Sequence, residues 1–545
     1  MSGTLLYEFP PANPNCLGLN FTNVQQRPIR QATVQLVDAT TNAVIASVVS
    51  DDTGLYSLTG PQNPEVFVRV RTELKNGANW DVEVRNNVVD PNDPNPPALA
   101  ARPIYVLDGS TFNTGTSGQT RDLTATTGWG GASYTGTRAA APFSILDSIY
   151  EGMLLIRGED ATATFAPLDA FWSPDNSTTQ GSGTFDQRAD SGEIGTSFYT
   201  QNMLFLLGND GDDAEEFDDH VIVHEWGHYF EDNFSRSDSI GGAHGVGDQL
   251  DMRVAFGEGF ATALAGIALN DPQYCDTLWF GGVLTGFEID IENDREQPVG
   301  WYNEISMLAL IYDLWDTAND GADTSSIGLG PIYDTMIGSQ ATGGAFTSIF
   351  TFATYLKQQG TGQDAFIDAL LTDHDVNPSG IDIYGSTELN DGPGTPDDVL
   401  PVYTEITLGN TQQICVNNQF DSGRDGNKLS EHRYLRFDLA VPSQLTFTMD
   451  TVNPPSTPSP GFDCNTAPET DPEIHQHSDP DFLVWRDGQL WVVGFSCEPN
   501  SEIAMTSGLL QAGTYVIDIN EFRHEDEQTV NPFPGQVCFD FTVSL

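Results

Sequence analysis

The stretch that decides the fold is Phe217-Asp-Asp-His-Val-Ile-Val-His-Glu-Trp-Gly-His-Tyr-Phe-Glu. It contains the pattern H-E-x-x-H, which runs from His224 to His228. Residues four apart lie on one face of an α-helix, about 6 Å apart along its axis, so both imidazoles can reach one zinc ion at about 2.0–2.1 Å. Glu225 then projects beside them, toward the water that the ion activates. The alternative is a helix with two surface histidines, but the chain has only 9 His and this helix is amphipathic and opened by acidic residues.

A catalytic zinc needs a third protein ligand and an open position for water. His220 is excluded, because the eight helical residues between it and His228 rise about 12 Å. The best candidate is Glu258, in an otherwise apolar stretch rich in small residues at 255–266. We expect Gly257 and Gly259 to let its helix approach the histidine helix. Burying a lone carboxylate is costly, and a metal would compensate it; the alternative is a solvated Glu on an amphipathic face.

Composition divides the chain into three regions. Residues 1–105 contain short alternating runs, such as Val66-Phe-Val-Arg-Val-Arg, and predict a β-sandwich. Residues 106–402 show helical periodicity at 139–157, 217–231, 252–270 and 301–316, with strand-like runs between, and predict an α+β domain. Residues 403–545 return to alternation and predict a second β-sandwich. The predicted fold is therefore multidomain, with an α+β domain flanked by two all-β sandwiches.

Several motifs resemble known families. The H-E-x-x-H pattern followed by a Gly-Glu-Gly helix resembles the gluzincin peptidases, in particular the thermolysin and fungalysin groups, and the segments 203–213 and 303–316 extend the likeness over residues 140–320. The N-terminal patterns at 28–34 and 52–58 resemble carboxypeptidase-regulatory-like and Cna-B-like modules. The C-terminal runs at 434–439, 444–449, 482–488 and 512–519 resemble the bacterial pre-peptidase C-terminal domain.

The gluzincin resemblance implies a secreted zinc endopeptidase with a thermolysin-like catalytic domain. It implies that the zinc ligands are His224, His228 and Glu258 and that Glu225 is the general base. The substrate would be a protein or a peptide.

The resemblance also has departures. Thermolysin-like proteins carry an Asp four residues after the ligand Glu, where this chain has Thr262. The carboxylate that orients a histidine is therefore missing or comes from elsewhere, and Asp251 is one substitute. The family uses a Tyr or His to hold the developing oxyanion; Tyr302 and His244 are the nearest candidates, and we expect both to be structural.

Two other functions compete with an endopeptidase. One is a structural or adhesive extracellular surface protein that retains a peptidase-like scaffold, which the many predicted sandwich strands favour. The intact Glu225 counts against it, since a degenerate site usually loses its base first. The other is a zinc hydrolase that acts on something other than a peptide.

The charge balance limits the partners. The chain has 545 residues with 21 Lys+Arg against 78 Asp+Glu, a formal charge of −57. Such a surface repels nucleic acid and anionic membranes and stays soluble in salty water through screening, so we expect a bacterial, saline-adapted protein without nucleic-acid partners. No run of apolar residues is long enough to predict a membrane span. The sequence sets no oligomeric state.

An acidic segment precedes the histidine helix. Residues 209–219 hold 7 carboxylates. They could bind Ca²⁺, which takes oxygen ligands in such loops, or they could favour the positive N-terminal end of the helix. Both interpretations stay open at this point.

The six cysteines form no CxxC pair, which argues against a zinc ribbon or redox motif. We predict disulfides between Cys464 and Cys497 and between Cys415 and Cys538. Cys16 and Cys275 then either tie the N-terminal region to the catalytic one or remain buried thiols. This pattern favours a secreted or cell-surface location.

Overall fold

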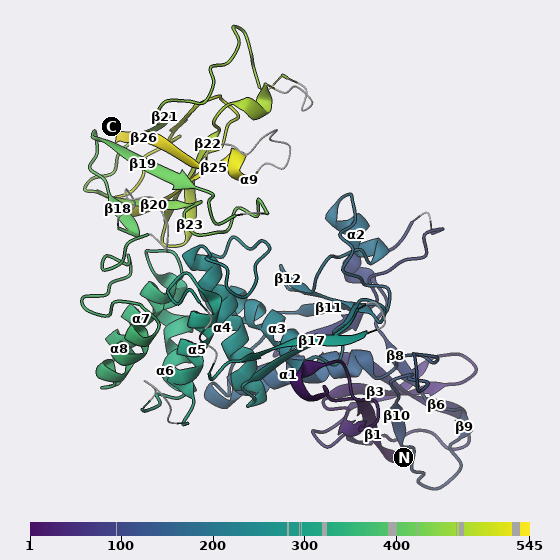
Figure 1. Cartoon of the computed structure of the whole chain (residues 1–545). Helices are drawn as coiled ribbons and strands as arrows, with labels where there is room; N and C mark the ends of the chain where they lie inside the picture. The colour runs from purple at the N-terminus through teal and green to yellow at the C-terminus, as the bar shows by residue number, and fades with distance from the viewer. Residues whose placement is uncertain are drawn as a thin grey trace. The chain divides into compact units, whose positions relative to one another are not determined.

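The computed structural model describes residues 1–93, 95–280, 283–293, 295, 297–318, 324–390, 401–421, 423–464, 466–467, 473–525 and 535–545. The protein is multidomain, with substantial β-sandwich content and a group of helices in the middle of the chain (Figure 1). It divides into two compact units: Met1–Asn233 with Ala261–Ile291, and Phe234–Phe260 with Glu292–Leu545. One helix, α4, runs through the boundary after Phe260 and contributes to both units.

The first unit holds most of the strands of the N-terminal half. Its strands are β1 (Ser2–Phe9), β2 (Gln25–Pro28), β3 (Ala32–Asp38), β4 (Val44–Val49), β5 (Leu55–Ser57), β6 (Glu65–Lys75), β7 (Asp81–Arg85), β8 (Val106–Asp108), β9 (Phe112–Asn113), β10 (Leu123–Ala125), β11 (Leu168–Trp172), β12 (Phe198–Thr200), β13 (Met203–Leu206), β14 (Gly208–Asn209), β15 (Asp213–Ala214), β16 (Gln273–Phe280) and β17 (Val283–Asp290). Its helices are η1 (Pro14–Cys16), η2 (Leu99–Ala101), α1 (Ala141–Glu159), α2 (Phe185–Ser191) and α3 (Asp219–Phe234), together with part of α4 (Met252–Leu269).

The large sheet of this unit continues from the N-terminal strands into the middle of the chain. Its order is β12-β13-β11-β7-β6-β3-β4, and β8 and β9 also pair with β6. β11 is parallel to both its neighbours, with Leu168 opposite Val82 and Asp169 opposite Met203. The strands predicted as a separate sandwich thus share a sheet with later strands, because β7 pairs with β11. The boundaries at residues 105 and 402 stay a prediction.

A second, smaller sheet in this unit leads into the histidine helix. Its order is β14-β15-β16-β17, and β16 and β17 form a long antiparallel hairpin. β15 pairs with β16 where Asp213 lies opposite Leu278. The histidine helix α3 begins at Asp219, five residues after β15 ends at Ala214.

Helix α3 is held by two close contacts at glycines. A Cβ on Gly227 would lie 2.8 Å from the Ala261 Cα, so the missing side chain lets α3 and α4 touch. A Cβ on Gly152 of α1 would lie 2.4 Å from the Trp226 ring, which is fully buried. Our expectation for Gly259 was wrong. A Cβ there would lie 2.4 Å from the Met307 Cβ, so Gly259 makes room for helix α5 (Glu304–Trp315) and not for α3.

The second unit contains a group of helices followed by a β-sandwich. Besides α5 its helices are α6 (Leu329–Thr335), η3 (Met336–Gln340), α7 (Ile349–Gln358), α8 (Asp364–Asp373), η4 (Ile474–Gln476) and α9 (Phe522–Glu525). Its strands are β18 (Tyr403–Glu405), β19 (Thr411–Asn417), β20 (Arg433–Leu439), β21 (Thr446–Thr451), β22 (Pro480–Arg486), β23 (Gln489–Gly494), β24 (Ser501–Met505), β25 (Gly513–Glu521) and β26 (Gln536–Ser544).

The C-terminal sandwich follows from the alternation in its strands. One sheet has the order β18-β20-β25-β22-β23 and the other β19-β26-β21-β24. Their inner faces share one apolar core, in which the Phe482 ring lies 5.9 Å from that of Phe447 and 5.4 Å from that of Phe541. Leu435 and Phe437 of β20 point into this core while Asp438 is exposed. The predicted C-terminal sandwich is confirmed.

The four predicted helices are also confirmed, as α1, α3, α4 and α5. Within the described part of the chain, α4 alone is long and apolar enough to cross a membrane, with a mean hydropathy of 1.3. Its 18-residue window is 89 % buried, as in the core helix of a globular domain.

The contact at Gly227 generates a stability prediction. Gly227→Ala should lower the free energy of unfolding by about 1–3 kcal/mol, because the new methyl overpacks the contact with Ala261. Gly158→Ala is the matched control: it also lies in a helix, and its Cβ would meet nothing within 4 Å. The control should be neutral or slightly stabilising. Urea unfolding of both variants checks this, and equal stabilities would contradict the close contact.

Candidate metal centre

Helix α3 presents His224 and His228 on one face, with their ring centroids 4.8 Å apart. Both side chains are partly exposed, whereas Glu225 between them is 8 % exposed. The helix predicted from the H-E-x-x-H pattern therefore places the two imidazoles side by side. Glu225 stays a prediction as the general base.

Each of the two imidazoles has an oxygen partner at Nδ1. The His224 Nδ1 lies 2.9 Å from the Thr262 Oγ1, and the His228 Nδ1 lies 3.4 Å from the Glu231 Oε2. When Nδ1–H donates to such an oxygen, the lone pair is on Nε2, the atom with which a histidine can bind a metal. We expected the orienting carboxylate to be missing or to come from elsewhere. At that position the Thr262 hydroxyl contacts His224 instead, and a hydroxyl can accept this hydrogen bond as a carboxylate does.

Glu258 lies on α4, one helical turn before Thr262, and is 7 % exposed. Ligand atoms of His224, His228 and Glu258 lie within 4.8 Å of one another. Two imidazole nitrogens and one carboxylate oxygen form a donor set that suits a zinc ion. The three residues that the sequence singled out as ligands are thus close together.

His244 contacts Glu258 and Glu304. Its Nε2 lies 3.3 Å from the Glu258 Oε2 and its Nδ1 lies 2.8 Å from the Glu304 Oε2. Burial alone would lower the pKa of His244, but the two carboxylates outweigh it and raise the pKa to about 11. The sequence analysis did not single out Glu304, the first residue of α5, as a partner of His244. Its position directly after Asn303, which caps the helix, was the one sequence feature that marked it.

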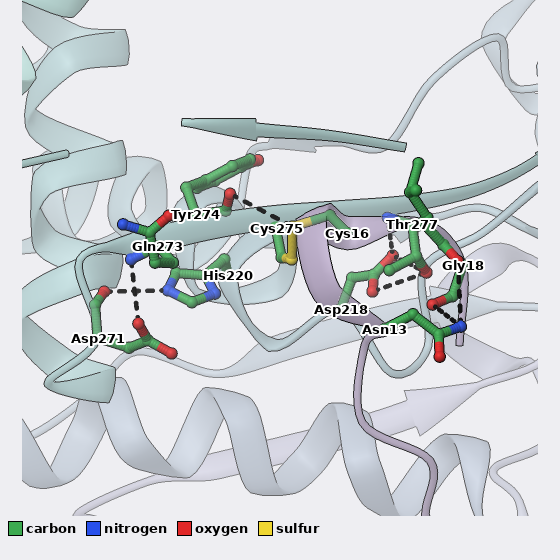
Figure 2. The surroundings of a disulfide bond; sticks show 11 residues. Asn13, Cys16, Gly18, Asp218, His220, Asp271, Gln273, Tyr274, Cys275 and Thr277 are labelled. Atoms are coloured by element: carbon green, nitrogen blue, oxygen red, sulfur yellow. Dashed lines mark hydrogen bonds between the residues drawn. A yellow bond between two sulfur atoms is a disulfide. The ribbon is translucent and has the colours of Figure 1, made fainter. Parts of the chain in front are cut away.

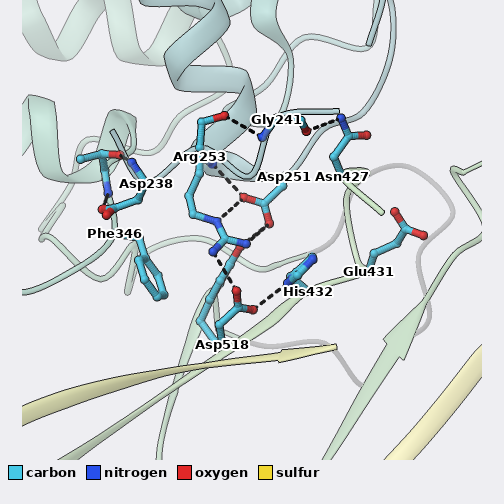
Figure 3. A network of polar contacts seen from close by, with 12 residues as sticks. Asp238, Gly241, Asp251, Arg253, Phe346, Asn427, Glu431, His432 and Asp518 are labelled. Carbon is cyan, nitrogen blue, oxygen red and sulfur yellow. Dashed lines mark hydrogen bonds and ion pairs between the residues drawn. The ribbon is translucent and has the colours of Figure 1, made fainter. Parts of the chain in front are cut away.

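The start of α4 is held by a buried ionic network (Figure 3). The Arg253 guanidinium lies 2.9 Å from Asp251 and 2.8 Å from Asp518, and His432 lies 2.7 Å from the other oxygen of Asp518. The Tyr434 hydroxyl donates a hydrogen bond to Asp251. Asp251 therefore pairs with Arg253 and Tyr434. Our prediction that Asp251 orients a zinc-binding histidine was wrong.

The acidic segment before α3 is largely buried. Asp218 accepts hydrogen bonds from the Thr277 backbone and hydroxyl at 2.9–3.0 Å, as Figure 2 shows. Glu216 pairs with Arg138 at 3.0 Å. Burial, together with the carboxylates of Asp276 and other neighbours, raises the pKa of Asp213 to about 8, and burial raises the pKa of Asp276 to about 6. The carboxylates of this segment therefore have particular buried surroundings and do not only place negative charge before α3.

Three disulfides link the six cysteines: Cys415–Cys538, Cys464–Cys497 and Cys16–Cys275. The two predicted pairs are confirmed, and the third joins η1 to β16 (Figure 2). The same figure shows His220 beside Asp271. The Nε2 atom of His220 lies 3.2 Å from the Asp271 carbonyl oxygen. The His220 imidazole therefore contacts the backbone just before β16.

Comparison with known proteins finds one family model that matches part of the chain. A family model described as the Mycolysin C-terminal domain matches residues 166–367, less than half of the chain. The matched range includes α3 and α4. No curated protein matches. Among solved structures, the chain is similar to the pre-peptidase C-terminal domain of collagenase from Bacillus anthracis, at 9 % identity over 26 % of this chain and 93 % of that one, with a TM-score of 0.16.

The family match indicates a peptidase-related context for the middle of the chain and fits a protein or peptide substrate. The disulfides fit an extracellular protein, since such bonds persist in oxidising compartments.

The buried network generates a pH prediction. Burial would lower the pKa of His432, but Asp518 outweighs it and raises the pKa to about 9. Because this pKa lies above the unfolded value of about 6.5, the stabilisation is complete below pH ~6.5 and is lost as the pH rises through about 9. This pKa shift corresponds to at most about 3 kcal/mol of stabilisation of the folded state, at about 1.36 kcal/mol per pKa unit. Melting temperatures should therefore fall between pH 6.5 and 9.5, and His432→Gln should flatten this slope.

The matched control is His374→Gln. His374 is buried in the same unit, but burial and Arg295 lower its pKa to about 3, so it stays neutral across this range. The control should keep the slope of the wild type. An unchanged slope in His432→Gln would contradict the assignment.

Proposed function

We propose that the protein is a secreted, zinc-dependent endopeptidase of the gluzincin type, with a thermolysin-like catalytic domain. The observation that carries the proposal is the grouping of ligand atoms from His224, His228 and Glu258 within 4.8 Å. The family match over residues 166–367, which includes both helices that bear these side chains, supports it. The disulfides support secretion.

The residues fit zinc by the chemistry of their donor atoms. Two imidazoles and one carboxylate form a ligand set that catalytic zinc sites use, with a further position left for water. Thr262 and Glu231 would orient the two histidines through Nδ1. When bound there, zinc supplies Lewis acidity, which polarises a carbonyl and lowers the pKa of water.

The chain's own residues would carry the proton transfers. Glu225, next to His224 on the same helix, would accept a proton from the attacking water and return it to the amine that leaves when the peptide bond breaks. His244, held between two carboxylates, would keep Glu258 in place through the 3.3 Å contact with its Oε2. It would then act as a positioning residue.

The test separates metal binding from chemistry. Glu258→Ala should lose most of the zinc found by metal analysis of the purified chain, because one of three ligands is removed. Glu225→Gln should retain one zinc per chain and lose at least about 100-fold in casein hydrolysis, because the general base is gone.

His220→Asn is the matched control on the same helix. Its ring contacts the Asp271 carbonyl oxygen, so both zinc content and activity should persist. Zinc content unchanged in Glu258→Ala would remove Glu258 from the ligand set. A zinc-loaded chain inert on casein and gelatin would favour the hydrolase of non-peptide substrates or the adhesive protein.

The hydroxyl of Thr262 gives a second test. Thr262→Val keeps the shape but removes the acceptor for the His224 Nδ1–H, so zinc affinity should fall by about 10–100-fold. Thr262→Ser keeps the hydroxyl and should bind zinc nearly as the wild type does. Competition with a chromophoric chelator measures both. Equal affinities for the Val and Ser variants would show that the contact has no part in metal binding.

A further inference from the structure

A second group of acidic side chains lies in the first unit, apart from the histidines. Asp213 on β15, Glu215 just after it and Asp276 on β16 have ligand oxygens within 4.8 Å of one another. Asp213 is 7 % and Glu215 4 % exposed, and Asp276 is partly buried. Three carboxylates are thus brought together from two strands that are far apart in sequence.

These carboxylates accept few hydrogen bonds. The Oδ1 atoms of both Asp213 and Asp276 are buried without a hydrogen-bond partner. Ser197 donates to one oxygen of Glu215. Within the described residues, no lysine or arginine is paired with any of the three.

The polar groups around the cluster are committed elsewhere. Arg138 pairs with Glu216 and with Asp210, at 3.0 and 3.3 Å. Thr277 donates to Asp218, which is itself a buried carboxylate. An uncompensated group of buried carboxylates is costly, and a bound cation would compensate it.

We propose that Asp213, Glu215 and Asp276 bind one calcium ion. Calcium takes oxygen ligands at about 2.3–2.6 Å, so two of its ligand oxygens can be at most about 4.6–5.2 Å apart, which the observed limit of 4.8 Å satisfies. The set contains no nitrogen or sulfur donor, which disfavours zinc. Backbone carbonyls and water complete the coordination of calcium in such sites.

The ion has a structural consequence for the histidine helix. It would tie β15 and the following Glu215 to β16, and Glu215 lies four residues before α3 begins at Asp219. Occupation of the site therefore stabilises the segment that leads into α3. The site does not depend on the proposed peptidase activity, and calcium binding can be measured without it.

The experiment measures calcium binding directly on the full chain. Equilibrium dialysis with ⁴⁵Ca²⁺ in 0.5 M NaCl suppresses loose association with the acidic surface, since the Debye length is then only about 4 Å. We expect one saturable calcium per chain in the wild type and a loss of at least about 10-fold in affinity in Asp213→Asn and in Asp276→Asn. The melting temperature of the wild type should rise with the logarithm of the CaCl₂ concentration once the site is filled.

Glu288→Gln is the matched control, because Glu288 is an exposed carboxylate on β17, opposite Cys275 in the same hairpin. It removes one negative charge without touching the cluster and should bind calcium as the wild type does. Absence of saturable calcium at 10 mM in the wild type would overturn the proposal, and so would wild-type calcium affinity in both Asp213→Asn and Asp276→Asn. Zinc content measured on the same samples distinguishes this failure from failure of the zinc site.

Discussion

The contact between Gly227 of α3 and Ala261 of α4 is the constraint on which the candidate metal centre depends. A Cβ on Gly227 would lie 2.8 Å from the Ala261 backbone, so any larger residue would push the helices apart. At this separation the next residue of α4, Thr262, reaches the His224 Nδ1. One missing side chain thus sets the spacing that lets one helix orient a histidine on the other.

The acidic composition leaves few cations for the buried carboxylates. The chain has 21 Lys+Arg for 78 Asp+Glu, and several arginines serve two acids each. Arg253 pairs with Asp251 and Asp518, and Arg138 pairs with Glu216 and Asp210. Within the described residues no lysine or arginine is paired with the buried Asp213, and there a bound cation would supply the positive charge, as we propose for calcium.

The two units use different means to hold strands together. In the C-terminal sandwich, apolar residues from two sheets form one core, and Cys415–Cys538 joins neighbouring strands β19 and β26. In the first unit, Cys16–Cys275 joins a short N-terminal helix to β16, two segments separated by 259 residues. A link of such long sequence separation restricts the unfolded chain strongly.

The sequence by itself determined the local features. The 3.6-residue periodicity placed α1, α3, α4 and α5, the alternation placed the strands of the C-terminal sandwich, and the spacing of His224 and His228 set them on one helical face. Each of these depends on residues within one helix or strand, where the period alone decides which side chains face together.

The tertiary structure alone decided the features that join distant segments. No local pattern indicates that Thr262 contacts His224, that Gly259 faces α5, or that Asp518 pairs with Arg253. The same holds for the approach of Asp276 to Asp213 and for the sheet shared by β7 and β11. These depend on how helices and strands pack, and packing is set by side chains that lie far apart in the sequence.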